Sequence, residues 1–570
     1  MAFLRHAALH AGLERATPHT VEVMVQSFRL RVAFVILGTL LSGSVPADDW
    51  PEWGGGSRRN MASEERGLPA EFHPGRKRRD RLGFDPATAQ NVRWIARLGG
   101  ENYSSAVVAD GRVYVGSNDE DLDDPRIAAT GGGMLHCLDE ATGALAWRLV
   151  VPKLEIDRSK VSEDFDAMDL GICSTATVDG DRVFIVSNRC EVLCLDADGL
   201  ADGNDGPFTD EATFPVPAGG TPIELGPHDA DIVWRFDMLR DLPVFPHDAA
   251  NCAVLIVGDC AYVGTANGVY DGKIVLPTAA SLIALDKRTG ELLARDDGGI
   301  SAGTFHGQWS SPTLADGNGR PLVVYGGGDG VCYGFELADP RSPSAGDPAT
   351  LRQAWRFDCN PPGYRRRGGV EIDYWALVRG GPRSLDADGM LVSPSEIIGS
   401  PVVHGGRIFV AIGQDPTHGP GRGALSCIAI DGSGDITGAG KVWQYLGIGR
   451  SLSTVSVADG LVYAAEFAGK VHCVDAATGT LEWVHDTREE IWSSTLVADG
   501  KVYLGTRKGL VVLQAGREKK HLADIRLGSP VWSVPTAANG TLFVATQKNL
   551  FAVEARAGGA EPEPEAAPAP

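Results

Sequence analysis

The feature that most constrains the fold is an internal repeat. Its clearest copy, residues 453–487, reads STVSVADG, LVYAAEFAGK, VHCVDAATGT and LEWVHDT. Each piece is a short run rich in Val, Tyr and Ala that ends at a D-G, A-G-K or A-T-G turn. This pattern is typical of four antiparallel strands joined by hairpins. Repeated four-stranded units that stack on one another predict a β-propeller.

The same unit recurs at 103–149, 172–238, 252–297, 310–358, 400–446, 453–487 and 493–527. An eighth copy at 532–554 supplies only three strands, and NVRWIARLG at 91–99 has the Trp-bearing pattern of the missing fourth. We therefore predict an all-β fold, an eight-bladed propeller of four-stranded antiparallel blades over 91–556. Pairing of 91–99 with the strands at 543–555 would close the ring and remove exposed sheet edges. Two separate β-sandwiches do not explain these complementary ends.

The two ends of the chain differ from the repeats. Residues 32–41, VAFVILGTLL, follow Arg29 and precede a small-residue stretch, as in a signal peptide cleaved after Ala47. The run is shorter than the roughly 20 residues that span a bilayer, so an uncleaved transmembrane helix is the weaker alternative. The predicted domains are a signal peptide (1–47, with a true start near Met24), an N-terminal extension (48–90), the propeller (91–556) and a disordered Pro/Ala/Glu tail (557–570). We expect an exported monomer of the periplasm or cell envelope, not an integral membrane protein.

The net charge and the positions of the cysteines bear on which partners and which disulfides the chain can have. The chain has 52 Lys and Arg against 74 Asp and Glu, a formal net charge of −22, which disfavours a nucleic-acid partner. Four of the ten cysteines recur at one strand position, which favours small buried apolar side chains: Cys137, Cys194, Cys427 and Cys473. Disulfides between Cys332 and Cys359 or between Cys173 and Cys190 remain open at this stage, because exported proteins form them.

A motif in the repeats resembles a known family. CLDEATGALAW and CVDAATGTLEW follow the pattern c-L-D-x-x-T-G-x-x-x-W, in which Asp accepts from turn amides, Gly takes a positive φ and Trp packs between blades. The pattern resembles the tryptophan-docking repeat of quinoprotein dehydrogenases, which use pyrroloquinoline quinone (PQQ), and of PQQ-like propellers such as BamB. Longer segments resemble exported bacterial PQQ-binding-like β-propeller proteins, among them 49–60, 201–212, 245–259, 306–312, 326–330, 356–361, 413–423 and 453–469.

The resemblance implies two functions. One is a binding or scaffold protein of the cell envelope, BamB-like, whose partner is an envelope protein or a small polar ligand. The other is a PQQ- and calcium-dependent dehydrogenase of alcohols or sugars. Quinoprotein dehydrogenases typically carry two adjacent cysteines, whereas no two cysteines of this sequence are adjacent, and it has no CxxCH haem site, G-x-S-x-G or HExxH motif. The sequence therefore favours the binding role over an enzyme.

Long polar loops concentrate on one predicted end of the propeller, at 117–133, 150–171, 239–251, 265–273, 298–309, 326–330, 359–399 and 413–423. Loops of this kind on a rigid scaffold mark a binding face. The ligand-binding candidates there are His247, His306, Gln308, Trp309, Asp329, Gln414, Asp415 and His418. We predict that His306, Asp329, Gln414 and His418 face one pocket near the axis, for a polar ligand or a metal. The alternative is that these side chains hydrogen-bond buried loop backbone.

Two acidic stretches are weak calcium candidates. They are 119–124 and the run that contains Asp198, Asp202, Asn204 and Asp210. Short Asp/Asn/Gly runs supply the six to eight oxygens that calcium needs, but the second run lacks EF-hand spacing. Solvated loops are the alternative interpretation of both.

Overall fold

The computed structural model describes residues 48–78, 83–297, 299–317, 319–340, 348–367, 370–372, 395–414 and 421–555. The predicted signal peptide and C-terminal tail lie outside these ranges. Helix is scarce in the described residues: α2 (Met238–Asp241) has four residues, and the others are 3-10 turns, namely η1 (Trp53–Gly55), η2 (Pro86–Thr88), η3 (Arg158–Lys160), η4 (Gly199–Ala201) and η5 (Ser301–Gly303). In this part of the chain, no helix has the length and hydropathy of a membrane-crossing segment.

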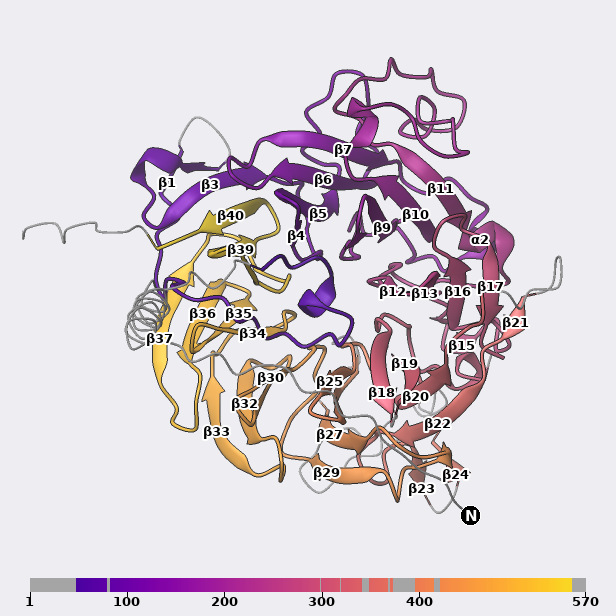
Figure 1. The fold of residues 1–570 in the computed structure, drawn as a ribbon, viewed down its shortest axis with the longest axis vertical. Coiled ribbons are helices and arrows are strands. Elements are labelled where there is room, and N and C mark those ends of the chain that lie inside the picture. Colours follow the sequence, from indigo (N-terminus) through magenta and orange to yellow (C-terminus); the bar gives the residue numbers. More distant parts are fainter. Residues whose placement is uncertain are drawn as a thin grey trace, which may run out of the picture. The chain divides into compact units, whose positions relative to one another are not determined.

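Eight sheets with four-stranded antiparallel cores succeed one another around a ring, which confirms the predicted eight-bladed propeller (Figure 1). Blade 1 consists of β4 (Val107–Ala109), β5 (Arg112–Asn118), β6 (Gly133–Asp139) and β7 (Leu145–Val151), and blade 2 of β8 (Thr177–Asp179), β9 (Arg182–Val186), β10 (Glu191–Asp196) and β11 (Ile232–Asp237). Blade 3 consists of β12 (Leu255–Val257), β13 (Cys260–Gly264), β16 (Leu282–Asp286) and β17 (Leu292–Arg295), and blade 4 of β18 (Thr313–Gly317), β19 (Arg320–Gly326), β20 (Val331–Glu336) and β22 (Gln353–Asp358).

Blade 5 consists of β25 (Val402–His404), β26 (Arg407–Ile412), β27 (Ala424–Ala429) and β29 (Lys441–Tyr445), and blade 6 of β30 (Ser456–Ala458), β31 (Leu461–Ala465), β32 (Lys470–Asp475) and β33 (Leu481–Asp486). Blade 7 consists of β34 (Thr495–Ala498), β35 (Lys501–Thr506), β36 (Gly509–Gln514) and β37 (His521–Arg526). Two further strands add in parallel to the outer edges of blades 3 and 4, β21 (Ala349–Thr350) and β28 (Gly434–Asp435). The small hairpins are β1 (Arg76–Lys77) with β2 (Phe84–Asp85), β14 (Val269–Tyr270) with β15 (Lys273–Ile274), and β23 (Arg366–Arg367) with β24 (Val370–Glu371).

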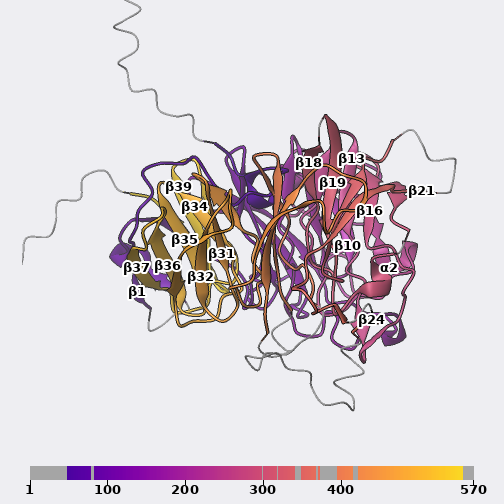
Figure 2. The same cartoon turned by 90° about the horizontal axis from the view of Figure 1, so that it is seen from below.

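Blade 8 combines strands from the two ends of the chain. β38 (Thr536–Ala538), β39 (Thr541–Ala545) and β40 (Asn549–Val553) form a sheet with β3 (Val92–Arg97), in the order β3-β40-β39-β38. β3 runs antiparallel to β40, from Val92 opposite Val553 to Arg97 opposite Asn549. Seen from the side, strands run between the two ends of the ring (Figure 2).

Tryptophans on outer strands join five of the eight blades to the next one, as the motif predicts. In blade 1 the turn before the tryptophan is shaped by the motif's Asp and Gly: Asp139 Oδ1 accepts from Thr142 N at 2.9 Å. Gly143 has φ 71°, and a Cβ on it would lie 2.6 Å from the ring of Trp94 in the preceding blade. The indole N–H groups donate to backbone carbonyls of the following blade, at Glu140 from Trp94, Ala197 from Trp147, Lys287 from Trp234, Ala476 from Trp443 and Gly516 from Trp483.

The cysteines are small apolar groups of these blades. The recurring position lies on the third strand directly opposite the docking tryptophan, as in Cys137 opposite Trp147 and Cys473 opposite Trp483. All ten cysteines are buried free thiols. The disulfides left open above, between Cys332 and Cys359 or between Cys173 and Cys190, are therefore not formed.

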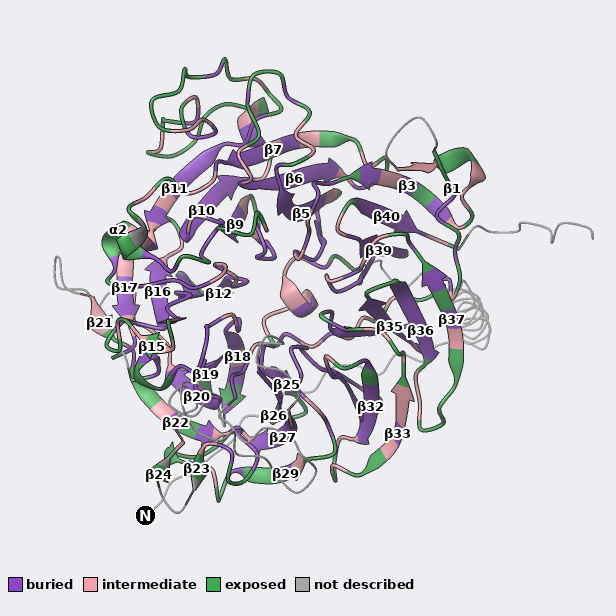
Figure 3. Ribbon diagram, turned by 180° about the vertical axis from the view of Figure 1, so that it is seen from behind, coloured by how far each residue is buried: buried purple, intermediate pink, exposed green. Residues whose placement is uncertain are grey.

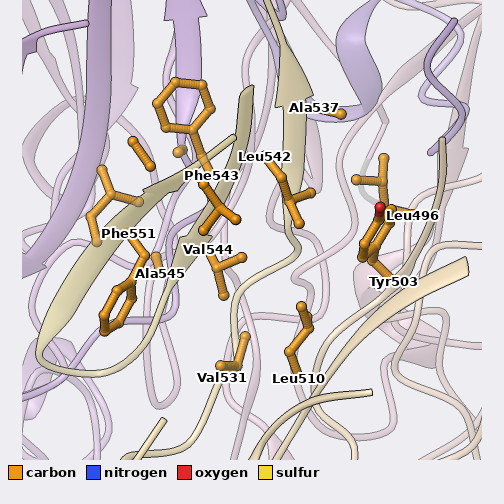
Figure 4. Packing of buried hydrophobic residues seen from close by; sticks show 14 of the residues in the cluster. Leu496, Tyr503, Leu510, Val531, Ala537, Leu542, Phe543, Val544, Ala545 and Phe551 are labelled. Carbon is orange, nitrogen blue, oxygen red and sulfur yellow. The ribbon is translucent and has the colours of Figure 1, made fainter. Parts of the chain in front are cut away.

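Apolar side chains fill the spaces between neighbouring blades, and burial follows the inner strands (Figure 3). The largest core cluster joins blades 7, 8 and 1, where Leu496, Tyr503, Leu542 and Phe543 pack together (Figure 4). Because each cluster is shared by adjacent blades, a blade cannot bury its faces alone.

An N-terminal segment, residues 50–63, crosses the centre of the ring (Figure 1). Trp50 and Val108 of blade 1 exchange backbone hydrogen bonds of 2.9 Å, and Asn60 makes both side-chain bonds to the backbone of Val457 in blade 6. Equivalent bonds reach the first strand of each blade, or in blade 3 the residue before it, through Val178, Val254, Leu314, Val403, Val497 and Ala537. The segment therefore ties all eight blades together at one place.

Candidate functional site

A cavity of about 540 Å³ lies at the centre of the ring. Every blade contributes the residue that stands shortly before its first strand: Tyr103, Cys173, Asn251, Trp309, Ile398, Leu452, Trp492 and Trp532. Trp53, in the N-terminal segment, lines the same cavity, and its Nε1 is buried without a hydrogen-bond partner. Since residues 50–63 bond to every blade, they form a fixed wall of this space.

Aromatic rings make up much of the cavity wall. The ring of Trp492 lies 5.7 Å from Phe467, 6.3 Å from Trp532 and 6.5 Å from Tyr103, measured between ring centroids. Trp492 is 37% exposed, and the three rings around it are only partly buried. Rings held in this way offer flat apolar surfaces with little freedom to lose on binding.

A second layer of hydroxyl groups holds the wall together. Two residues further along each blade stand Ser105, Thr175, Ala253, Ser311, Ser400, Thr454, Ser494 and Val534. The backbone N–H at this position donates to the hydroxyl of the next blade, for example Ser400 N to Thr454 Oγ1 at 2.9 Å and Thr454 N to Ser494 Oγ at 2.8 Å. The donor positions of blades 2 and 7 lack such an acceptor, because the next blades carry Ala253 and Val534, which have no hydroxyl group. These bonds fix the spacing of the blades around the cavity.

Two histidines and an aspartate meet on one side of the cavity. His247 Nε2 lies 3.3 Å from Asp248 Oδ1, and His306 Nε2 lies 3.3 Å from Asp248 Oδ2. The two imidazole rings are 4.6 Å apart, and the ring of His306 is 5.4 Å from Trp309. All of them line the cavity. The long loops 150–171, 239–251 and 298–309 reach the same space through Asp164, His247 and His306.

The other predicted site residues lie elsewhere. Gln308 is 1% exposed and donates to Asn267 O at 3.0 Å, away from the cavity lining. Asp329 is 2% exposed, accepts from Tyr333 OH at 2.6 Å, and lies 3.7 Å from Arg365. Burial raises the pKa of Asp329 to about 6.

The predicted grouping around one pocket therefore needs correction. His306 lines the cavity, but Asp329 and the buried Gln414 do not. Asp415 and His418 lie outside the described residues. Asp329 follows the second strand of its blade, and its side chain accepts from Tyr333 in the loop network rather than lining the cavity.

The side chains of the two acidic stretches mainly make hydrogen bonds and ion pairs within the protein. Asp119 accepts from the backbone of Thr130 and Gly131 at 2.7 and 2.8 Å. The Arg126 guanidinium holds the pKa of Asp124 well below its usual range. In the second run, Asp198 and Asp202 gather with Asp196 within 4.8 Å, while Asp210 is not in that group. Asp196 already pairs with Arg182.

Several cavity residues escaped the sequence analysis, although signals for them exist. Asp248 directly follows His247, and adjacent His-Asp residues in a loop are candidate ligands. Tyr103, Trp492 and Trp532 all stand directly before a serine at the same repeat position, so aligning the blades would have found them. For Trp53 no local pattern predicts a place at the centre of the ring.

Comparison with known proteins identifies the family. The sequence profile described as outer membrane protein assembly factor BamB matches residues 122–335 and 344–557. This chain belongs to that family. The BamB family match covers most of the propeller, and comparison with curated proteins gives no match.

Three solved structures illustrate what the chain is similar to. BamB from Moraxella catarrhalis is 13% identical, with 82% of this chain and 99% of that chain covered and a TM-score of 0.46. A europium-containing methanol dehydrogenase is 14% identical, with 88% and 90% covered and a TM-score of 0.46. The quinohemoprotein alcohol dehydrogenase from Comamonas testosteroni is 12% identical, with 91% and 83% covered and a TM-score of 0.39. At these identities the likeness concerns the fold, not the chemistry.

The cavity lining does not fit PQQ with calcium. PQQ is a flat tricarboxylic acid, and a site for it needs cationic side chains to balance its charge. The described residues that line the cavity include no Lys or Arg, whereas the carboxylates of Asp164 and Asp248 are present. Calcium takes six to eight oxygen ligands, and two carboxylates with two imidazoles are a poor set for it. The aromatic rings alone do not make a quinone site.

Proposed function

We propose that the protein is an exported binding propeller of the cell envelope, which takes a small polar ligand in its central cavity. The observation that supports this most is the aromatic cavity itself, about 540 Å³ and lined from all eight blades. That volume lies within the roughly 300–1,000 Å³ typical of ligand pockets. Three of the long loops line it through Asp164, His247 and His306.

The lining indicates the chemical class of the ligand. Trp309, Trp492 and Trp532 offer flat apolar faces, whereas Ser494 and Asp248 offer hydrogen-bonding groups. Because carboxylates are present and cationic side chains are absent from the described lining, a neutral ligand is favoured over an anion. A neutral ring that carries hydroxyl groups, of monosaccharide or disaccharide size, satisfies both requirements.

The test is a titration of the purified protein with neutral mono- and disaccharides, followed by isothermal calorimetry and tryptophan fluorescence. We expect saturable binding at one site and a change in fluorescence, because four tryptophans line the cavity. Trp492→Ala should abolish binding with little change in melting temperature, since Trp492 is 37% exposed. Leu481→Ala, which removes an exposed side chain of outer strand β33, is the matched control. Equal binding by both variants would contradict a site in the cavity.

A scaffold role is the second candidate, favoured by membership of the BamB family. It predicts a specific envelope protein recovered with the tagged wild-type chain and lost from a chain altered on the long-loop end. The dehydrogenase alternative predicts dye reduction with alcohols or sugars after addition of PQQ and Ca²⁺. Sustained turnover in that assay would contradict a purely binding role.

Export is part of the proposal. It rests on the predicted signal peptide at residues 1–47. N-terminal sequencing of protein from the producing cell's envelope should begin at Asp48, whereas an intact apolar segment would argue against cleavage.

A further inference from the structure

The His247, Asp248 and His306 cluster has the geometry of a metal site. The three ligand atoms, one from each side chain, lie within 4.8 Å of one another. Each Nε2 is 3.3 Å from a different oxygen of the same carboxylate. Atoms that share one ion at about 2.0–2.2 Å lie about 3.0–3.4 Å apart in tetrahedral or octahedral coordination. The observed contacts match that spacing.

The backbone that carries Asp248 is held in place before any ion binds. The carbonyl of Asp248 accepts from Asp166 N at 3.0 Å, and the next carbonyl, of Ala249, accepts from Trp309 Nε1 at 2.9 Å. The His306 ring packs 5.4 Å from Trp309. Asp248 has φ 56°, a left-handed conformation that these bonds maintain. Preorganised ligands of this kind reduce the ordering cost of metal binding.

The nature of the ligands selects the ion. Two imidazole nitrogens and one carboxylate oxygen suit Zn²⁺ and Fe²⁺, while Ca²⁺ and Mg²⁺ prefer all-oxygen sites. The side chains of His247, Asp248 and His306 are only 11%, 22% and 10% exposed, and all three line the central cavity. Three protein ligands leave coordination positions open. Since all three side chains line the cavity, a ligand in the cavity would have access to such positions.

We propose that His247, Asp248 and His306 bind one divalent transition-metal ion, Zn²⁺ or Fe²⁺, in the wall of the central cavity. The ion would supply a Lewis-acidic contact for a hydroxyl or carbonyl oxygen of the ligand. Only this contact rests on the proposed function; the metal site itself needs no organic ligand. A metal titration without sugar therefore separates the two proposals.

The experiment uses chelator-stripped wild-type protein titrated with Zn²⁺, with Fe²⁺ under anaerobic conditions, and with Co²⁺ as a spectroscopic probe. We expect one ion per chain and visible Co²⁺ absorption bands. Asp248→Asn and His306→Gln should each weaken Zn²⁺ binding by at least about 100-fold. Loss of a residue that only hydrogen-bonds to a metal ligand costs at most about 100-fold, so a larger loss indicates a direct ligand. His521→Ala, which removes an exposed histidine 3.0 Å from Asp524, is the matched control and should bind like wild type.

A second measurement needs only the wild-type chain, in case a variant fails to fold. Saturating Zn²⁺ should protect His247 and His306 from modification by diethylpyrocarbonate, as mapped by mass spectrometry. The exposed His404 should react equally with and without Zn²⁺. No stoichiometric metal binding, equal affinity in the folded variants, or unprotected His247 and His306 would each overturn the proposal.

Discussion

Arg59 is the side chain on which the N-terminal segment most depends. It is fully buried, and its guanidinium donates to Glu52 Oε2 at 2.6 Å, to Val254 O and Pro312 O at 3.0 Å, and to Trp53 O at 3.1 Å. One side chain thus joins the segment to blades 3 and 4. Arg59→Met keeps much of the volume but removes the charge and all four hydrogen bonds.

The expected loss is about 3–5 kcal/mol in the free energy of unfolding, as when one partner of a buried ion pair is removed. The structure explains why. The Glu52 side chain is 15% exposed, so its carboxylate would lose its partner without gaining full hydration. Burial already raises the pKa of Glu52, and Arg59 opposes that rise. Glu52→Gln should therefore recover part of the loss in the Arg59→Met background.

Chemical denaturation of the two single variants and the double variant measures this coupling. Hydrogen exchange should show faster exchange in peptides covering residues 50–63 of Arg59→Met, because this segment would open locally. Arg59→Lys keeps the charge but not the planar guanidinium, so its free energy of unfolding should lie between those of the wild type and of Arg59→Met. A loss below about 1 kcal/mol with unchanged protection of 50–63 would refute the reasoning.

Three further predictions follow from the structure. Burial raises the pKa of Asp329 to about 6, so between about pH 4 and 6 the folded state keeps a proton that the unfolded chain has lost. The free energy of unfolding should then fall as the pH rises through that window, by up to about 3 kcal/mol, and Asp329→Asn should abolish this dependence in denaturation curves. Thr454→Val leaves Ser400 N without its acceptor and should cost about 1–3 kcal/mol by the same measurement; no loss would show that the hydroxyl layer is dispensable. Thiol reagents should find almost no reactive cysteine in the native protein and ten after unfolding without reductant, whereas fewer than ten would indicate a disulfide.

The propeller could be predicted because its determinants are local and repeated. The turn before Trp147 is set by Asp139, Thr142 and Gly143, within a few residues of one another. Such local signals identify hairpins independently of one another, and the strand-and-turn unit they belong to recurs in all eight blades. The place of β3 was predictable for the same reason, since Trp94 repeats the docking pattern.

The centre of the ring was not predictable in the same way. Ser63 reaches Ala537 across 474 residues, and the segment 50–63 has neither the alternation of a strand nor the period of a helix. The direction in which a side chain points also could not be predicted from the sequence. Asp329 and His306 were assigned to one pocket, but Tyr333 holds Asp329 in the loop network. The His247–Asp248–His306 cluster depends on two loops that meet only in the fold.

A crystal structure of the protein soaked with its tightest-binding neutral sugar tests the central claim most directly. The account predicts ligand density in the cavity against Trp309, Trp492 and Trp532, with residues 50–63 still bonded to the first strands. Ligand density on the outer surface, with the cavity empty, would contradict it.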